Sequence, residues 1–378
     1  MHTLDPSVGG VASSVLALSR GMAERGHKID LVVLDDPSAA WIRSVDVNVQ
    51  AIGAGIGSYR YSDALMPWLR EHGGNYDRVI VNGLWQYLSF AAWRRYAGSA
   101  IPYYVFPHGM LDPWFKKTFP LKHLKKWLYW PWAEYRVLRD AAAVIFTSEE
   151  ERLLAHQSFW LYRARENVSP LGIKAPLISS NDKSEFLARY PQLQNSRNFL
   201  FLGRLHPKKG CDLLLEAFAH AKSAEPISLI LAGPDQIGWE RELRSQISRL
   251  NLADRVVFTG MLRGVMKQGA FAAADAFVLP SHQENFGIAV VEALAAGVPA
   301  LISSRVNIWR EIEGDCAGYI QSDDVAGTTR LLQQWIETSP SERDRMRENA
   351  RKCFERRFEL NCAVDSLFHI LSEPVPVK

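Results

Sequence analysis

Short apolar runs alternate with longer stretches of helical periodicity twice along this chain of 378 residues. In the first half the β-rich runs are residues 28–34, 47–52, 78–82, 102–106 and 142–147. In the second half they are residues 198–202, 227–232, 255–258, 276–280 and 299–303. Strands that alternate with helices favour parallel sheets with crossover helices. The sequence therefore predicts an α/β protein with two doubly wound, Rossmann-like domains.

The alternation stops and restarts at the Pro-Leu-Gly turn that ends at Gly172. We expect domain boundaries at 1–172 and 173–356, and at about 150 residues per domain each half can bury its own core. The chain becomes charged and helix-rich towards its end. We expect residues 357–378 to form a helix that crosses back to the first domain.

The composition argues against several classes of protein. Hydrophobic residues make up 47% of the chain, and 44 basic against 41 acidic residues leave a net charge of +3. This apolar content excludes intrinsic disorder, and the small charge disfavours a nucleic-acid binder. No apolar run approaches the roughly 18 to 20 residues of a spanning helix. The start, MHTLDPSVGG, lacks the pattern of a secretory signal, so we expect a cytoplasmic protein.

The cysteines do not form a metal site or a disulfide framework. Cys211, Cys316, Cys353 and Cys362 are scattered, with no CxxC pair and no ligand-like spacing. Reduced, buried thiols in a cytosolic protein are the expectation. The sequence contains no Asp-x-Asp motif, so we expect no bound metal.

The segment LPSHQENFGIAVVEALAAGVPAL combines a strand end, a polar loop and a helix. Glu284 lies in the loop, and Glu292 follows eight residues later inside the helix. The amides of Asn285, Phe286 and Gly287 would lie at the helix N-terminus, which favours an anionic ligand. Loops at the carboxyl ends of parallel strands are where open α/β sheets bind ligands. The alternative is that two carboxylates flank this turn by coincidence.

A second polar turn, GRLHPKKG, follows the strand 198–202 and precedes a helix. Arg204 offers a guanidinium suited to bidentate phosphate contact, and Lys209 adds a mobile point charge. Together they could neutralise a diphosphate without a metal. The alternative is a solvated basic turn.

In their order and spacing, these segments resemble the retaining glycosyltransferases of family 4, which have the GT-B architecture. Glu284 and Glu292 match the family's E-x7-E element. Arg204 and Lys209 match its diphosphate-binding Arg/Lys pair. The resemblance implies two facing domains.

The resemblance extends over nearly the whole chain. In the second half it includes Gly233 in AGPD and Gly260 in VFTG, each after a strand. In the first half it includes the turn of Gly9 and Gly10 and the segment PHGMLDPW, which contains His108. That last segment further resembles bacterial enzymes of exopolysaccharide or O-antigen assembly.

The resemblance implies a nucleotide-sugar donor held mainly by the second domain. Arg204 and Lys209 would stabilise the leaving diphosphate electrostatically. Glu284, with the amides of residues 285–287, would hold the hydroxyls of the donor sugar. Glu292 would accept hydrogen bonds from the ribose hydroxyls.

The remaining residues of the implied site come from both halves. Gly233 and Gly260 would border the donor, Gly260 beside the base. Gly9 and Gly10 have no side chain that would keep the phosphate and the acceptor from the first helix's N-terminus. His108 would act beside the transferred sugar, or it is a hydrogen-bonded structural histidine. Trp85 would line the acceptor side, or it packs in the core.

The implied reaction moves a hexose, with retention, from a nucleoside diphosphate to a saccharide acceptor, and it needs neither a metal nor a cofactor besides the donor. We expect the acceptor to be lipid-linked, in surface polysaccharide biosynthesis. Two alternatives remain open. One is a nucleotide-sugar epimerase or phosphorylase of the same fold, and the other is a non-catalytic nucleotide-sugar-binding subunit.

The stretch KKTFPLKHLKKWLYWPW, from Lys116 to Trp132, combines five lysines with many apolar and aromatic residues. Such a composition can attract anionic head groups while its aromatics lie at the interface. This would place the protein peripherally at the inner face of a membrane. The alternative is a solvated helix face followed by an aromatic anchor into the core.

The start of the chain departs from the family pattern. Family members usually begin with a short apolar strand before the Gly-Gly turn, whereas this chain begins MHTLD. We expect the first strand to be missing, with the true start lying upstream; the alternative is a compromised first domain. In a doubly wound sheet that strand is central, so its neighbours would keep unpaired edges.

Overall fold

The computed structural model describes residues 1–374. The chain divides into two compact units, unit 1 formed by Met1–Gly172 with Leu360–Lys378 and unit 2 formed by Ile173–Glu359. The second boundary lies at 359 rather than at the expected 356. The reason is that Phe358 belongs to unit 2: its carbonyl accepts from the Ile173 amide at 3.0 Å, and its ring packs edge-on against Phe286. Residues 375–378 of the expected final segment lie outside the described residues.

The elements of unit 1 are, in chain order, α1 (Gly10–Ala23), β1 (Asp30–Val33), α2 (Ala40–Arg43), β2 (Asn48–Ala51), α3 (Leu65–His72), η1 (Gly73–Asn75), β3 (Val79–Asn82), α4 (Tyr87–Tyr96), β4 (Tyr103–Phe106), α5 (Trp114–Thr118), α6 (Pro120–Tyr129), α7 (Glu134–Asp140), β5 (Ala143–Phe146), α8 (Glu149–Ala155), β6 (Glu166–Val168) and α17 (Leu360–Ser372).

The strands of unit 1 form two separate parallel sheets. One has the order β3-β4-β5-β6 and the other is the pair β1-β2. All four residues of β4 and of β5 are buried, as expected for parallel strands covered on both faces. The five predicted runs of the first half each contain a strand. The sixth strand, β6, has only three residues and was not predicted.

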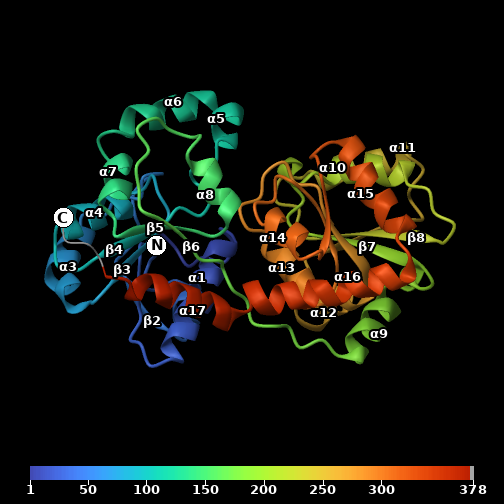
Figure 1. The fold of residues 1–378 in the computed structure, drawn as a ribbon, viewed down its shortest axis with the longest axis horizontal. Helices are drawn as coiled ribbons and strands as arrows, with labels where there is room; N and C mark the ends of the chain where they lie inside the picture. Colours follow the sequence, from blue (N-terminus) through green and yellow to red (C-terminus); the bar gives the residue numbers. More distant parts are fainter. Residues whose placement is uncertain (375–378) are drawn as a thin grey trace. The chain divides into compact units, whose positions relative to one another are not determined.

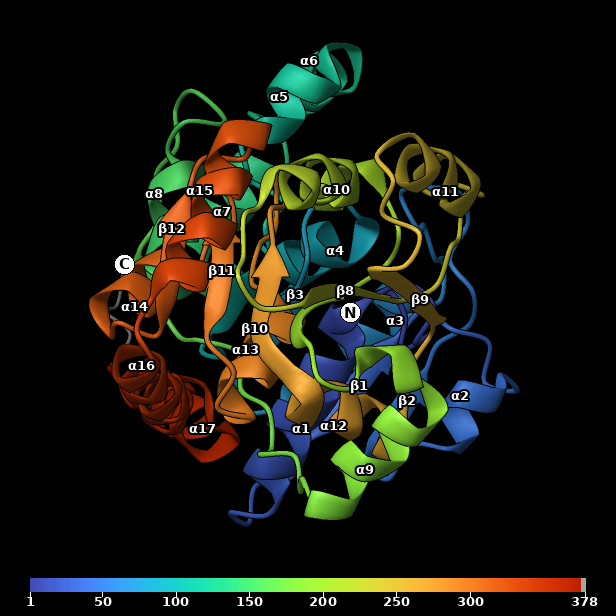
Figure 2. The ribbon, with the colours of Figure 1, turned by 90° about the vertical axis from the view of Figure 1, so that its right-hand side faces the viewer.

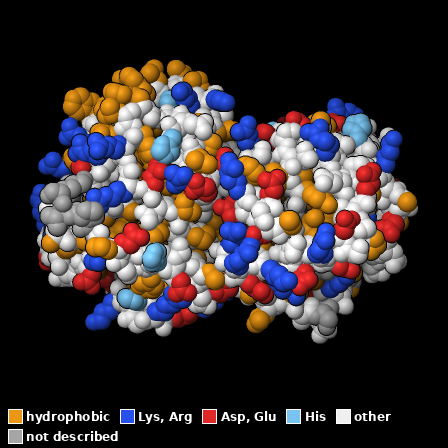
Figure 3. Space-filling model, in the orientation of Figure 1, with side chains coloured by type: hydrophobic (Ala, Val, Ile, Leu, Met, Phe, Trp, Pro, Cys, Tyr) orange, Lys and Arg blue, Asp and Glu red, His pale blue; other side chains and the backbone are white. Residues whose placement is uncertain are grey.

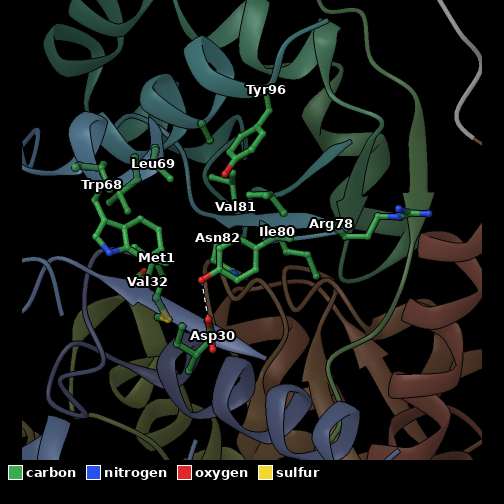
Figure 4. Close-up of a pocket in the computed structure, with 16 residues that line it drawn as sticks. Met1, Asp30, Val32, Trp68, Leu69, Arg78, Ile80, Val81, Asn82 and Tyr96 are labelled. Atoms are coloured by element: carbon green, nitrogen blue, oxygen red, sulfur yellow. Dashed lines mark hydrogen bonds between the residues drawn. The ribbon is translucent and has the colours of Figure 1, made fainter. Parts of the chain in front are cut away.

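A cavity of about 130 Å³ lies between β1 and β3, where no strand of the described chain joins the two sheets. Residues 30–32 line one side and residues 79–82 the other, as Figure 4 shows. Met1 also lines the cavity, and its amino group donates to the Val32 carbonyl at 3.0 Å. Apart from this Met1 contact, no strand within residues 1–374 pairs with the edges of β1 and β3 that face the cavity, at the place where the central strand of a doubly wound sheet would lie.

Helix α17 packs on α1 within unit 1. Gly21 makes this close approach possible, because a Cβ there would meet the Val364 side chain at 2.7 Å. The His27 ring lies 4.3 Å from the Phe368 ring at the same contact. The last helix of the described chain therefore belongs to the first unit.

The elements of unit 2 are α9 (Ser180–Arg189), η2 (Pro191–Leu193), β7 (Arg197–Leu202), η3 (Pro207–Lys209), α10 (Cys211–His220), β8 (Ile227–Ala232), α11 (Glu240–Arg249), β9 (Val256–Gly260), α12 (Gly264–Ala273), β10 (Ala274–Leu279), α13 (Ile288–Ala295), β11 (Ala300–Ser303), α14 (Trp309–Gly314), β12 (Gly318–Gln321), α15 (Val325–Glu337), α16 (Pro340–Cys353) and the π-helix η4 (Phe354–Phe358).

Unit 2 is a doubly wound parallel sheet of order β12-β11-β10-β7-β8-β9. Its first strand, β7, is central, and the chain builds β8 and β9 on one side of it and β10 to β12 on the other. Helices α10, α11 and α15 cover one face and α9, α12 and α13 the other (Figures 1 and 2). The direction of winding therefore reverses between β7 and β10, which is where open α/β sheets bind ligands.

Candidate active site

Two predicted loops of unit 2 meet at this reversal point. The ammonium of Lys209, after β7, forms an ion pair and hydrogen bond with the carboxylate of Glu284, after β10. The His282 amide donates to the Lys208 carbonyl at 2.9 Å and ties the same loops together. Both strands are parallel neighbours, so their carboxyl ends leave the same edge of the sheet. The two motifs, 75 residues apart in sequence, thus form one site.

The site combines a half-buried ion pair with an exposed cation. The side chains of Lys209 and Glu284 are 17% and 19% exposed, whereas Arg204 is exposed and donates to the Gln236 side chain at 3.3 Å. Burial, followed by the charges of Lys208 and Arg204, lowers the pKa of Lys209, and the contact with Glu284 opposes this by favouring the ammonium. An anion bound at these cations would offset their mutual repulsion and their desolvation.

Glycines let the loops after β7, β8 and β9 approach closely. A Cβ at Gly233, whose φ is +151°, would meet the Gly203 carbonyl oxygen at 1.7 Å, so no larger residue fits there. The Gly203 amide donates to Ala232 O at 2.9 Å, and the Gly233 amide donates to Gly260 O at 2.8 Å. Gly233 and Gly260, both predicted from sequence, therefore lie in one backbone ladder at the carboxyl edge.

The loop before α13 is fixed by the segment after β11. The Glu284 amide donates to Arg305 O, and the Asn307 amide donates to Glu284 O, each at 2.9 Å. The Asn307 side chain also donates to the Asn285 side chain at 3.4 Å. Gly287 then caps α13 with a φ of +77°. The predicted amides thus lie in a held loop at the start of this helix.

Phe286 and Glu292 have partners that the sequence did not indicate. Phe286 is only 3% exposed and packs against Phe358, so its side chain is not available to a ligand. Glu292 lies on α13, and Lys267 of α12 donates to its carboxylate at 2.6 Å. Lys267 was not predicted, because it is 25 residues away from Glu292 and belongs to no motif.

In unit 1, His108 follows β4 in a left-handed conformation with φ of +50°. Its Nε2 lies 2.8 Å from the Asn82 Oδ1 at the end of β3, and its ring stacks on Phe106. Its Nδ1 is buried and has no hydrogen-bond partner within residues 1–374. Burial, with a smaller effect of the Met1 amino group, lowers the pKa of His108 to about 4. A neutral imidazole with one unengaged nitrogen results.

The His108 loop is held by a buried carboxylate. Glu151, 3% exposed, accepts from the Gly109 amide at 2.5 Å through one oxygen. Its other oxygen accepts from the amide and the hydroxyl of Thr147 at 2.7 and 2.6 Å. The sequence analysis missed Glu151, which lies 42 residues from Gly109 in an ordinary acidic helix start.

The other predicted residues of the first half lie in different surroundings. The Trp85 indole donates to Met110 O at 3.2 Å, and its ring lies 5.1 Å from the Phe159 ring. These contacts favour the packing interpretation of Trp85, and its role on the acceptor side stays a prediction. Gly9 caps α1 with a φ of +138°, and, its two chain neighbours aside, no heavy atom of the described residues lies within 4 Å of a Cβ built there. Gly10 is the first residue of α1.

Two absences bear on the kind of site. Within residues 1–374, no three His, Cys, Asp or Glu side chains are grouped as ligands for a metal ion. In the same part of the chain, no helix has the length and apolar character needed to cross a bilayer.

A doubly wound sheet with cations and a helix start at its reversal point is typical of α/β proteins that bind nucleotides. Two family models narrow this class. "Glycosyl transferase 4-like domain" matches residues 9–172, and "Glycosyl transferases group 1" matches residues 182–353. The chain therefore belongs to the family 4 glycosyltransferases of the GT-B architecture, as the sequence motifs indicated.

Curated relatives are also glycosyltransferases. The chain is 25% identical over 337 residues to mannosylfructose-phosphate synthase of Agrobacterium fabrum. This match covers 80% of this chain and 73% of that protein. It is 32% identical over 168 residues to phosphatidyl-myo-inositol mannosyltransferase of Mycobacterium leprae, 43% of this chain and 42% of that one. Over 209 residues it is 28% identical to alpha-monoglucosyldiacylglycerol synthase of Streptococcus pneumoniae, 53% of this chain and 46% of that one. In the last two cases the match spans less than half of the relative.

Solved structures share the fold. HepE of Anabaena, in complex with UDP and glucose, has a TM-score of 0.77 at 20% identity, and the match covers 98% of each chain. WaaG, a glycosyltransferase involved in lipopolysaccharide biosynthesis, has a TM-score of 0.66 at 18% identity over 97% of each chain. At these identities the likeness concerns the fold.

Proposed function

We propose that this protein transfers a hexose, with retention, from a nucleoside-diphosphate sugar to a saccharide acceptor. The observation that carries the proposal is the contact of Lys209 with Glu284 across the reversal point of unit 2, with Arg204 close enough to affect the pKa of Lys209. Cations there suit a diphosphate, and a carboxylate beside them suits sugar hydroxyls.

In this proposal Arg204 and Lys209 bind the diphosphate and stabilise the charge that develops on it as the glycosidic bond breaks. Glu284 then accepts hydrogen bonds from the donor sugar, and the amides of residues 285–287 hold its other polar groups. Glu292, positioned by Lys267, accepts from the ribose hydroxyls. Cationic side chains supply the electrophilic assistance, so the proposed transfer needs no metal.

For unit 1, we propose that His108 contacts the transferred sugar through its unengaged Nδ1. Its low pKa keeps the ring neutral at physiological pH, so Nδ1 can form a hydrogen bond to a hydroxyl without adding charge. Gly9, Gly10 and Trp85 belong to the same acceptor side in this proposal.

The wider role rests on similarity and on surface composition. HepE binds UDP-glucose in a solved complex, which supports a nucleotide-sugar donor here. WaaG acts in lipopolysaccharide biosynthesis, which supports a place in surface polysaccharide assembly. We propose a lipid-linked acceptor and a peripheral location at the inner face of a membrane, supported by the basic and aromatic segment between Lys116 and Trp132.

The first experiment is a mass-spectrometric screen of nucleotide-sugar donors with saccharide acceptors. For the active donor, Arg204→Ala and Lys209→Ala should each lower turnover by about 100-fold, the usual effect of losing a group that stabilises transition-state charge. Lys222→Ala is the matched control, because Lys222 is exposed and lies after α10, towards the opposite edge of the sheet. Unchanged turnover in both site variants would mean that the phosphate assignment is wrong.

Product analysis separates the alternatives. A glycosylated acceptor with released nucleoside diphosphate supports transfer. An isomerised donor, or sugar 1-phosphate formed with inorganic phosphate, would instead indicate an epimerase or a phosphorylase. Nucleotide binding without turnover over all acceptors would indicate a non-catalytic subunit.

A further inference from the structure

Helix α6 of unit 1 exposes large apolar side chains. Leu121, Leu124 and Leu128 recur at the spacing of one helix face and are 82%, 56% and 61% exposed. Trp127 and Trp132 beside them are 42% and 69% exposed. Figure 3 shows hydrophobic atoms gathered over α6 at the upper edge of this unit. A solvated helix normally presents polar residues on this face, so the arrangement needs an explanation.

The opposite face of α6 attaches the helix to its unit. Trp130 is fully buried, and its indole donates to Trp160 O at 2.8 Å. The His123 ring stacks on Phe159 at 4.7 Å, and the Lys126 ammonium lies 4.6 Å from the centre of the Trp85 ring. Because this face is already packed, the outward leucines are not the helix's intramolecular core. The aromatic anchor given as the alternative in the sequence analysis exists, but the exposed face of the helix carries apolar rather than polar side chains.

The surroundings of the leucines are positively charged. Lys116, Lys117, Lys122 and Lys125 are all exposed, and residues 116–132 contain no Asp or Glu. We call this group of exposed leucines, tryptophans and lysines the α6 surface. In Figures 1 and 2, α5 and α6 lie on the outside of unit 1, away from strands β3 to β6. The exposure of the three leucines shows that no other described part of unit 1 covers them. The Trp127 ring lies 5.9 Å from the ring of Trp160, which is itself 50% exposed.

We propose that the α6 surface docks unit 1 on a bilayer that contains anionic lipid. The leucines enter the boundary between head groups and acyl chains, the tryptophans lie at that boundary, and the lysines contact the anionic head groups. A protein partner would have to match both an apolar stripe and a fully basic flank, whereas an anionic bilayer offers both over any area. The inference rests on the proposed function and deepens it, because an enzyme docked on a bilayer can reach an acceptor that is anchored there by its lipid.

The test is co-sedimentation of the full chain with vesicles of phosphatidylcholine alone or with about 30% phosphatidylglycerol. We expect binding to the anionic vesicles, at least ten-fold weaker binding to neutral ones, and weakening at high salt because the lysine contribution is screened. The combined variant Leu121→Gln, Leu124→Gln and Leu128→Gln should lose binding at least ten-fold. So should Lys122→Glu with Lys125→Glu, and the tryptophan fluorescence of the native chain should shift to the blue only when vesicles bind.

Leu177→Gln is the matched apolar control, because Leu177 is 88% exposed in unit 2, and Lys352→Glu is the matched charge control, at an exposed lysine of α16. Equal binding to neutral and anionic vesicles, or unchanged binding by the leucine variant, would overturn the proposal. So would a dimer in light scattering that the leucine variant abolishes, because the surface would then contact a second copy. Binding of UDP, GDP and ADP is measured by calorimetry in parallel. A native chain that binds one of these nucleotides but not vesicles refutes this inference alone. A chain that binds vesicles but none of the three nucleotides refutes the nucleotide assignment alone.

Discussion

At the scale of single residues, the site of unit 2 depends on one contact between two loops. Lys209 and Glu284 are each less than one-fifth exposed, so removing either partner leaves a desolvated charge without its counterpart. Breaking a buried ion pair lowers the free energy of unfolding by more than an exposed ion pair contributes to it. The pair therefore holds the two loops together, and under the proposed function a bound diphosphate would compete with Glu284 for Lys209.

A double-mutant cycle tests this coupling. We expect Lys209→Met and Glu284→Gln each to lower the free energy of unfolding by roughly 1 to 3 kcal/mol. The double variant should lose clearly less than the sum, because neither charge is then left unpaired. The measurement is urea unfolding without nucleotide, with Lys222→Met as the control. Strict additivity would show that the two charges do not interact in solution.

At the scale of elements, the two sheets of unit 1 leave facing edges on β1 and β3. The Met1 amino group already pairs with Val32 O, and the Leu4 amide donates to the Asp35 side chain, so the chain start runs parallel to β1. A segment that continues from Met1 in the same direction would enter the cavity between residues 30–32 and 79–82. It would find hydrogen-bonding groups on both sides.

We therefore expect that an engineered extension of about five alternating β-branched and apolar residues before Met1, roughly 17 Å of strand, raises the melting temperature. The physical reason is a new ladder with two neighbours and burial of the cavity walls. The control is an extension of equal length made of glycine and serine, which adds chain without strand propensity. An equal effect of both extensions would contradict the expectation. Differential scanning calorimetry gives the comparison.

The sequence predicts some helices and strands of this chain better than others. Runs such as 102–106 and 227–232 are apolar, bounded by turn residues and buried on both sides, so their pattern is unambiguous. The strands β6 and β12 were missed because they are short edge strands, with residues ENV and GYIQ, that lack such a pattern. For the segment of α6 the composition indicated basic and aromatic residues suited to a membrane interface, but only the packing of Trp130 and His123 shows that the leucines face outwards.

The contact between the two loops could be anticipated because Lys209 and Glu284 lie in local motifs that follow strand ends. The ligand-binding roles of Arg204, Lys209, Glu284 and Glu292 stay predictions. Lys267 was not predicted because it contacts Glu292 from another helix, α12, and no local spacing in the sequence indicates that contact.

At the scale of the whole molecule, the stability of the protein depends on pH through buried titratable groups of unit 1 whose pKa values are shifted in opposite directions. Burial lowers the pKa of the Met1 amino group to about 6 and that of His108 to about 4. Burial raises the pKa of Glu134, which accepts from the Trp85 amide and the Ser89 hydroxyl, to about 7. Each group therefore favours its neutral form in the folded state.

The signs follow from proton binding. Between about pH 8 and 6 for Met1, and between about pH 6.5 and 4 for His108, the unfolded chain binds the proton more readily, so these groups lower the stability as the pH falls. For Glu134 the folded chain holds a proton between pH 7 and 4.5 that the unfolded chain has released. Glu134 thus raises the stability as the pH falls through that window. His108 and Glu134 largely cancel in the native chain.

Single variants of His108 and Glu134 should show the two opposing contributions to the pH dependence of stability separately. Relative to the native chain, we expect His108→Gln to become progressively more stable as the pH falls from 6.5 to 4, and Glu134→Gln to become progressively less stable as the pH falls from 7 to 4.5. Each change can reach about 3 kcal/mol, since one pKa unit corresponds to about 1.4 kcal/mol. Urea unfolding at half-unit pH steps measures both differences, and the double variant should restore a nearly flat difference below pH 6.5. Differences of the same sign for both variants would show that at least one of these side chains is solvated rather than buried as the structure has it.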